Sequence, residues 1–272
     1  MKILIPTDFS ETANNVQPIL NRLSNFFDVE VHFVHVLQPI DSFVADPNGV
    51  LDMVDNSILI QEEAIETSIR HKLNLLKVQM PFPSHAHLLT GSFSLQIAEF
   101  AEAHKMDLIV MGTKGASGLE GFFFGSEAQH VVREATRPVL TVKGEHTDFS
   151  FGKVLFIHNF EENNEQEFFL LSELQRQTNL EITALQIIEK EQSTDELEEK
   201  MHYFATNMGI VFAEHQFLDA DSIEAGITSF VENHSFDLLV IGTHQRHSIF
   251  HHSVAESLVN TIYKPVLTFR LK

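Results

Sequence analysis

The 272-residue chain contains no cysteine and no tryptophan. Without cysteine it has no disulfide framework, no thiol nucleophile and no cysteine-ligated zinc site. Basic residues are also scarce, because 18 lysines and arginines stand against 38 aspartates and glutamates, a formal net charge of −20. A surface of that sign repels nucleic-acid phosphates and anionic lipid. We therefore expect neither nucleic-acid binding nor a basic membrane anchor.

Long apolar runs are missing too. No stretch approaches the roughly 18–20 apolar residues that span a bilayer. The first ten residues, MKILIPTDFS, lack the longer apolar stretch and cleavage site of a signal peptide, so we expect a cytoplasmic protein. With 43% hydrophobic and 21% charged residues the chain is typical of folded globular proteins, and its length fits one large or two ordinary domains.

The most informative feature that is present is an internal repeat. KILI at residue 2 recurs as KVLF at residue 153, DLIVMGT at 107 recurs as DLLVIGT at 237, and RPVLTVK at 137 recurs as KPVLTFR at 264. Ordered matches of this kind indicate duplicated structural units. We predict two homologous domains, residues 1–146 and 152–272, joined near residues 144–151.

Each half alternates short aliphatic runs with amphipathic segments. This alternation predicts right-handed crossovers and, in each half, an open doubly wound α/β sheet whose strands are buried on both faces. The strands predicted in the first half are Lys2–Pro6, Val29–Val36, His85–Leu89, Leu108–Met111 and Val139–Val142, and those in the second are Lys153–Ile157, Leu180–Ile188, Val211–Phe217, Leu238–Ile241 and Val266–Phe269. The helices predicted in the first half are Glu11–Phe27, bent or delayed by Pro18, then Ile58–Val78, Leu95–His104 and Glu127–Glu134.

A glycine pattern follows the fourth predicted strand. Gly112, Gly115 and Gly125-Ser126 form the spacing G-x2-G-x9-G-S, and the last pair opens a helix. Glycines let main-chain amides approach a ligand, and a helix N-terminus binds anions, so the loop favours phosphate, although such glycines also suit plain turns. If the first and fourth strands are neighbours, Asp8 faces this loop across one crevice. Its carboxylate could then accept hydrogen bonds from a ribose or an adenine amine.

Four segments together resemble the universal stress protein family in its tandem two-domain form: IPTDFS at residue 5, His35-Val36, the glycine pattern from Met111, and RPVL at residue 137. The resemblance implies a parallel sheet of order 3-2-1-4-5 in each domain, with the two domains paired through their last strands as an intramolecular pseudo-dimer. Its ATP-binding members hold adenosine near the strand-one aspartate and the phosphates on the glycine loop. By position, the residues implied are Pro6, Thr7, Asp8, Val36, Met111, Gly112, Gly115, Gly125 and Ser126, with Lys114 in the same loop.

The first half departs from this pattern at the start of the last helix. Glu127 follows Gly125-Ser126, and a carboxylate in the first helical turn competes with a phosphate for the positive end of the helix dipole. Lys114, Glu120 and Glu127 give the loop a net charge of −1. We therefore expect a bound triphosphate to need Mg²⁺.

The second half has lost the motif. His158-Asn159 stand where the first half has Thr7-Asp8, and Gln245 stands in place of Gly115, so we expect no nucleotide there. The corresponding loop instead carries histidines, which could ligate zinc or nickel, or could simply lie on an exposed loop released from phosphate contact. We assign no metal to this loop. Its histidines are His244, His247, His251 and His252.

Three functions remain open. The first is a stress-response protein that binds ATP or another adenine nucleotide in its N-terminal domain and acts as a nucleotide-dependent regulator, with an unidentified protein partner and a homodimer of tandem chains as further expectations. The second is a nucleotide-free scaffold or chaperone-like protein, and the third is a weak ATP hydrolase. The chain lacks a Walker loop and paired carboxylates with a base. We therefore expect no catalytic residues and favour the first.

Overall fold

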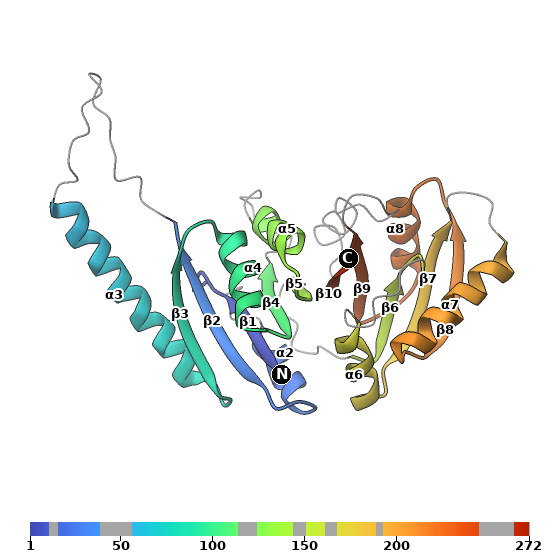
Figure 1. The fold of residues 1–272 in the computed structure, drawn as a ribbon, viewed down its shortest axis with the longest axis horizontal. Coiled ribbons are helices and arrows are strands. Elements are labelled where there is room, and N and C mark those ends of the chain that lie inside the picture. Colours follow the sequence, from blue (N-terminus) through green and yellow to red (C-terminus); the bar gives the residue numbers. More distant parts are fainter. Residues whose placement is uncertain are drawn as a thin grey trace, which may run out of the picture.

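The computed structural model describes residues 1–10, 16–38, 56–113, 124–143, 151–160, 168–188, 193–244 and 264–271. They form two α/β units that lie side by side (Figure 1). The strands of the first unit are β1 Lys2–Pro6, β2 Glu30–Leu37, β3 Ser84–Thr90, β4 Leu108–Thr113 and β5 Val139–Lys143. Those of the second are β6 Lys153–Ile157, β7 Glu181–Ile188, β8 Phe212–Asp219, β9 Leu238–His244 and β10 Val266–Leu271.

All ten strands belong to one sheet, in the order β3-β2-β1-β4-β5-β10-β9-β6-β7-β8. Each unit therefore has the order 3-2-1-4-5, and within each unit the strands pair in parallel. The predicted α/β fold with two tandem parallel sheets is confirmed.

The two units meet where β5 pairs with β10 in the antiparallel direction. The contact is symmetric: the Thr141 hydroxyl donates to the Val266 carbonyl (3.3 Å) and the Thr268 hydroxyl donates to the Val139 carbonyl (3.2 Å). Both threonines are buried. The pairing joins the last strands of the two units, as the pseudo-dimer prediction requires, and it covers two edges that would otherwise be open to other chains.

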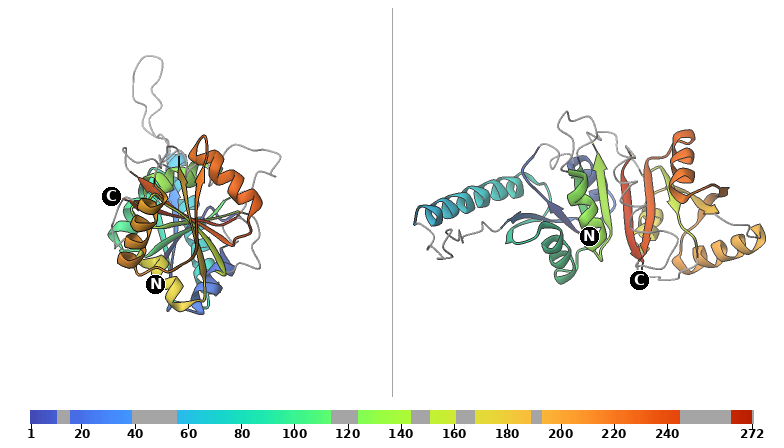
Figure 2. Two further views of the ribbon diagram at one scale, coloured as in Figure 1. Left: turned by 90° about the vertical axis from the view of Figure 1, so that its right-hand side faces the viewer. Right: turned by 90° about the horizontal axis from the view of Figure 1, so that it is seen from above.

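Helices cover both faces of the sheet (Figure 2). Side chains of β1 alternate between them, because Ile3 and Ile5 pack in the core that contains α2, whereas Leu4 packs in the core that contains α4 and α5. Among the described residues, none of the helices is both long and apolar enough to cross a membrane. The helices are α2 Gln17–Ser24, α3 Asn56–Gln79, α4 Phe93–Ala103, α5 Phe124–Glu134, α6 Phe169–Gln177, α7 Thr194–Met208 and α8 Ile223–Asn233.

Two features refine the sequence predictions. Helix α2 begins at Gln17 with Pro18 in its first turn, which is the predicted delay, because proline fits the start of a helix and disrupts its interior. The helix ends at Ser24, before the predicted Phe27, and residues 11–15 lie outside the described part. The edge strands β3 and β8 are also more exposed than predicted, since a strand at the end of a sheet has a neighbour on one side only. The expectation that every strand is buried on both faces was wrong for these two.

Candidate functional site

A cavity of about 190 Å³ lies at the carboxyl ends of β1, β2 and β4. Strands β1 and β4 are adjacent, and the helices that follow them, α2 and α5, pack on opposite faces of the sheet. A reversal of this kind opens the crevice in which doubly wound sheets bind their ligands. The residues around the cavity are Pro6, Thr7, Asp8, Ser10, Val36, Gln38, Phe93, Met111, Gly112, Glu127 and Ala128.

The turn that follows β1 is held by three hydrogen bonds to Thr7. Its amide donates to the Val34 carbonyl (2.9 Å), its carbonyl accepts from His35 Nδ1 (2.7 Å), and its hydroxyl oxygen accepts from the Phe9 amide (3.0 Å). Phe9 has a φ of 64°, a left-handed conformation that a bulky residue keeps only when its surroundings fix it. The Phe9 ring stacks on His35, with ring centroids 4.8 Å apart. The turn is therefore a rigid support.

This support presents Asp8 at the cavity. The side chain is exposed, and its Oδ1 accepts from the Ser10 amide (2.9 Å). A carboxylate offers about four acceptor positions on its two oxygens, so this one bond leaves capacity for donors on a ligand.

The electrostatics of the cavity are negative. Asp8 and the half-buried Glu127 are the two charged residues among the described side chains that line it. Glu127 lies in the first turn of α5, as the sequence predicts. An anionic ligand therefore meets two carboxylates, and a divalent cation would offset them.

The cavity is small, since ligand pockets usually measure about 300–1,000 Å³. A larger cavity of about 630 Å³ lies where the two units meet, lined by Arg137, Phe169 and Arg270 among others. None of the predicted site residues that the structure describes lines it. We favour the smaller cavity because it lies at the switch point of a doubly wound sheet.

Six of the ten predicted nucleotide-binding residues meet at this cavity: Pro6, Thr7, Asp8, Val36, Met111 and Gly112. Gly125 and Ser126 lie in the first turn of α5, directly before the lining residues Glu127 and Ala128. Lys114 and Gly115 lie outside the described residues, as do three of the four histidines of the loop to which we assign no metal, His247, His251 and His252. The fourth, His244, ends β9, away from this cavity.

The second unit has the same turn after its first strand, but it lacks an exposed side chain at the position of Asp8. Phe160 has a φ of 57°, and its amide donates to His158 Nδ1 (2.8 Å), just as the Phe9 amide donates to Thr7. Asn159, the counterpart of Asp8, is only 3% exposed. The second unit thus has the same backbone turn after its first strand, but the residue equivalent to Asp8 is buried and cannot contact a ligand.

Sequence reasoning missed a histidine cluster on β2 and β3. His32 lies between Glu30, His85 and His87, and alternating E-x-H and H-x-H patterns on the two strands are the signal that could have revealed it. Burial lowers the pKa of His32 below its ordinary value and the pKa of His87 to about 4, so both rings are neutral at neutral pH. The hydrogen bond from His32 lowers the pKa of Glu30.

Comparison with known proteins identifies the family. The model of the universal stress protein family matches residues 1–143. The chain belongs to the universal stress protein family. A universal stress protein of Methanocaldococcus jannaschii is 36% identical over 143 residues, which cover 52% of this chain and 81% of that protein.

Solved structures extend the likeness to both units. The crystal structure of a universal stress protein from Archaeoglobus fulgidus covers 99% of this chain and 98% of its own, with a TM-score of 0.73 and 18% identity, which shows a shared fold. A universal stress protein of Arabidopsis thaliana was crystallised with AMP bound; it covers 55% of this chain and 95% of its own at 18% identity. Its TM-score is 0.37.

Proposed function

We propose that this universal stress protein binds an adenine nucleotide, ATP with Mg²⁺, in the cavity of its N-terminal unit and acts as a nucleotide-dependent regulator. One observation carries the proposal. Six residues that the family resemblance implies for nucleotide binding come from three different strand ends and line a single cavity at the switch point of the sheet.

Each wall of the cavity has a role in the proposal. Val36 and Met111 are 9% and 6% exposed and supply an apolar surface for the adenine ring. Asp8 accepts hydrogen bonds from the ribose hydroxyls. Gly112 and the first turn of α5 lie on the phosphate side, where main-chain amides and the helix dipole favour an anion.

The lining also supports a regulator rather than a catalyst. Among its described residues the titratable groups are Asp8 and Glu127, and neither is paired with a histidine or lysine that would serve as an acid or base. The Mg²⁺ ion in the proposal offsets these carboxylates and the phosphates. A nucleotide held in this way is retained, and its occupancy can report the state of the cell to a partner.

The test is isothermal titration of the full chain with Mg-ATP and with AMP. Asp8→Asn removes a charged acceptor of the ribose, worth about 1.5–3 kcal/mol, so affinity should fall roughly 10- to 100-fold. Gly115→Gln installs the residue of the second unit, Gln245, and should abolish binding. Asp219→Asn is the matched control, because this exposed aspartate ends β8 of the second unit and its change removes the same charge.

Glu127→Gln tests whether the phosphates of the nucleotide lie near α5. Loss of this carboxylate should strengthen the binding of ATP several-fold and change the affinity for AMP less. The reason is that the triphosphate of ATP has more negative charge than the monophosphate of AMP, so Glu127 repels it more strongly. Equal affinity in the wild type, Asp8→Asn and Gly115→Gln, or no binding of either nucleotide at millimolar concentration, would refute the proposal. A protein partner that is retained without nucleotide would then favour the scaffold function.

A further inference from the structure

The histidine cluster on β2 and β3 is independent of the nucleotide cavity. Glu30 is the first residue of β2, and Val36 lies six residues further along the strand, a distance of about 20 Å. Glu30 and His32 project from one face of β2, and the register of the parallel pair places His85 of β3 directly beside His32. The sheet thus gathers three potential metal ligands at the end opposite to the cavity.

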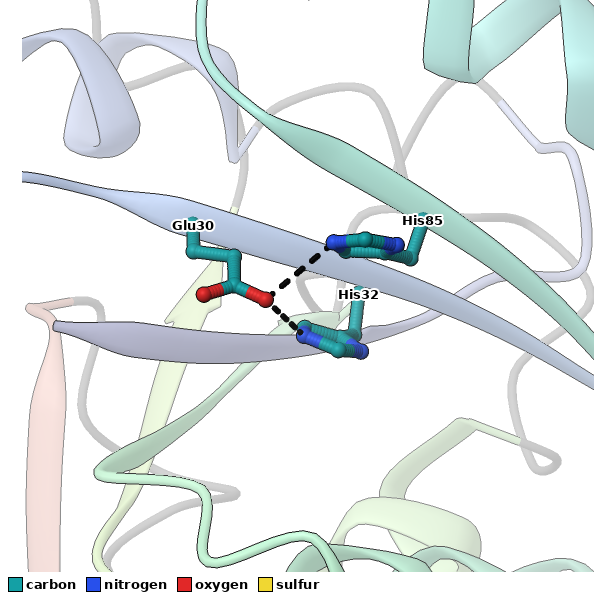
Figure 3. A group of neighbouring side chains, drawn as sticks. All are labelled: Glu30, His32 and His85. Atoms are coloured by element: carbon teal, nitrogen blue, oxygen red, sulfur yellow. Dashed lines mark hydrogen bonds and ion pairs between the residues drawn. The ribbon is translucent and has the colours of Figure 1, made fainter.

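The donor atoms of this cluster converge on one point. Glu30 Oε1 lies 3.0 Å from His32 Nε2 and 3.1 Å from His85 Nε2, and both rings turn their Nε2 atoms toward the same carboxylate oxygen (Figure 3). All three donor atoms lie within 4.8 Å of one another. Ligands of a tetrahedral zinc ion, at about 2.0–2.1 Å from the metal, are separated by about 3.3 Å. The cluster therefore needs only small side-chain shifts to surround an ion.

We propose that Glu30, His32 and His85 form a binding site for a borderline divalent transition-metal ion, and that Zn²⁺ is the ion that these ligands fit best. Two imidazoles and one carboxylate are ligands that zinc accepts, and three protein ligands leave a fourth position for water. The side chains of Glu30 and His85 are 34% and 49% exposed, so an ion can enter from solvent. The net charge of −20 on the chain favours the approach of a cation.

A second layer of contacts orients the buried ligand. His32 Nδ1 lies 3.1 Å from His87 Nε2. A ligating histidine commonly donates its other ring N–H to an acceptor, and the unprotonated nitrogen of a neutral imidazole is one. The His87 ring packs against Phe100 of α4, with ring centroids 4.7 Å apart. With an ion on Nε2 of His32, the Nδ1–H donates to His87. His87 is thus a positioning residue.

The second unit provides an internal comparison. Strand registers place Glu181, Thr183 and Glu214 at the positions equivalent to Glu30, His32 and His85. Strands of the same fold are therefore built without these histidines, and the fold does not require them. One neighbour opposes a cation, since Lys2 is the β1 partner of Glu30 in the register. A site of one carboxylate and two neutral rings accordingly suits an ion that imidazole binds strongly, rather than Mg²⁺ or Ca²⁺.

The experiment titrates Zn²⁺ into the full chain, prepared without a polyhistidine tag and stripped of metal with a chelator, and uses Co²⁺ absorption as a second probe of tetrahedral ligation. His85→Gln removes the exposed ligand, which the fold does not need, and should weaken zinc affinity at least ~100-fold, more than the loss of an outer partner. His87→Gln should weaken it about 10-fold. His215→Gln is the matched control, because His215 lies on the other edge strand, 3.5 Å from Glu198, and its loss should leave affinity unchanged.

The histidine-rich loop must be tested in parallel, because it offers competing ligands. A variant with His247, His251 and His252 replaced by Gln should retain the zinc binding that depends on His85. The proposal is refuted if His85→Gln binds zinc as tightly as the wild type, or if the loop variant loses all high-affinity binding. Neither outcome bears on the nucleotide cavity, so the two proposals succeed or fail separately.

Discussion

Leu140→Ala tests whether the two units of the sheet stabilise each other. Leu140 of β5 and Leu267 of β10 are direct partners across the antiparallel junction, and each is 2% exposed. Both belong to one hydrophobic core that continues from the first unit into the second, where it includes Phe269. Truncation of a side chain in the first unit at this junction should therefore lower the stability of the second unit as well.

The magnitude follows from the burial. Leucine to alanine removes three buried carbons, worth about 2.4 kcal/mol of transfer free energy, and the remaining cavity brings the usual cost to about 2–5 kcal/mol. If roughly half of this cost falls on contacts with the second unit, that unit loses about 1–2 kcal/mol of stability. Opening of the second unit should then become about 5- to 30-fold more frequent.

Hydrogen–deuterium exchange with mass spectrometry measures the effect locally. Peptides that cover β6 report on the second unit, because this strand lies in its interior between β9 and β7. We expect their exchange to accelerate by the factor above in Leu140→Ala. Leu4→Ala is the control: Leu4 is fully buried, but its core contains residues of the first unit alone among those described, so β6 should respond much less.

Two outcomes would contradict this reasoning. If Leu140→Ala accelerates exchange in β4 and β5 and leaves β6 unchanged, the junction contributes no stability to the second unit. If both variants accelerate hydrogen exchange in β6 equally, the chain unfolds as one cooperative unit. The core at the junction then contributes no more to the stability of the second unit than other buried residues do.

Two further changes test buried contacts elsewhere. Burial lowers the pKa of Lys143 from 10.5 to about 8, so between pH 8 and 10.5 the unfolded chain binds more protons at this residue and stability rises with pH. Relative to Lys143→Met, the free energy of unfolding of the wild type, measured by urea denaturation, should gain up to about 3 kcal/mol over this interval. Gly226→Ala should lower the unfolding free energy by about 1 kcal/mol, because an added Cβ would lie 2.9 Å from Ile187 Cδ1 and 3.0 Å from Ala220 Cβ, and the crowding exceeds the gain in helix propensity.

Each of these changes has its own control. For Lys143, a pH dependence that is the same in the wild type and in Lys143→Met would show that burial does not perturb the lysine. For Gly226, Ile187→Val removes the methyl group nearest to the added Cβ, so the double variant should recover part of the loss. A Gly226→Ala variant that is more stable than the wild type would mean that the core at α8 relaxes without cost.

Much of the fold was predictable from the sequence. Duplicated segments indicated two units, and continuous aliphatic runs such as Lys2–Pro6 and Lys153–Ile157 located the central strands to the residue. These strands are buried from both sides, so their hydrophobic pattern is imposed by packing alone. The bounds of the helix around Pro18 were less predictable, because they depend on local backbone preferences. The edge strands were less predictable because their side chains are partly exposed, which weakens the hydrophobic pattern in the sequence.

The sequence by itself determined which residues lie at the strand ends. Asp8 and Gly112 each follow an apolar run, and a parallel sheet brings such ends to one edge whatever the details of packing. Tertiary structure alone decided that the cavity is small, and that the pairing of β5 with β10, which the family resemblance implies, runs antiparallel. It also decided that His32 lies beside His85, since the two are 53 positions apart in the chain and meet only through the register of β2 and β3. Register depends on the packing of every strand and helix at once, and no local segment of the sequence contains that information.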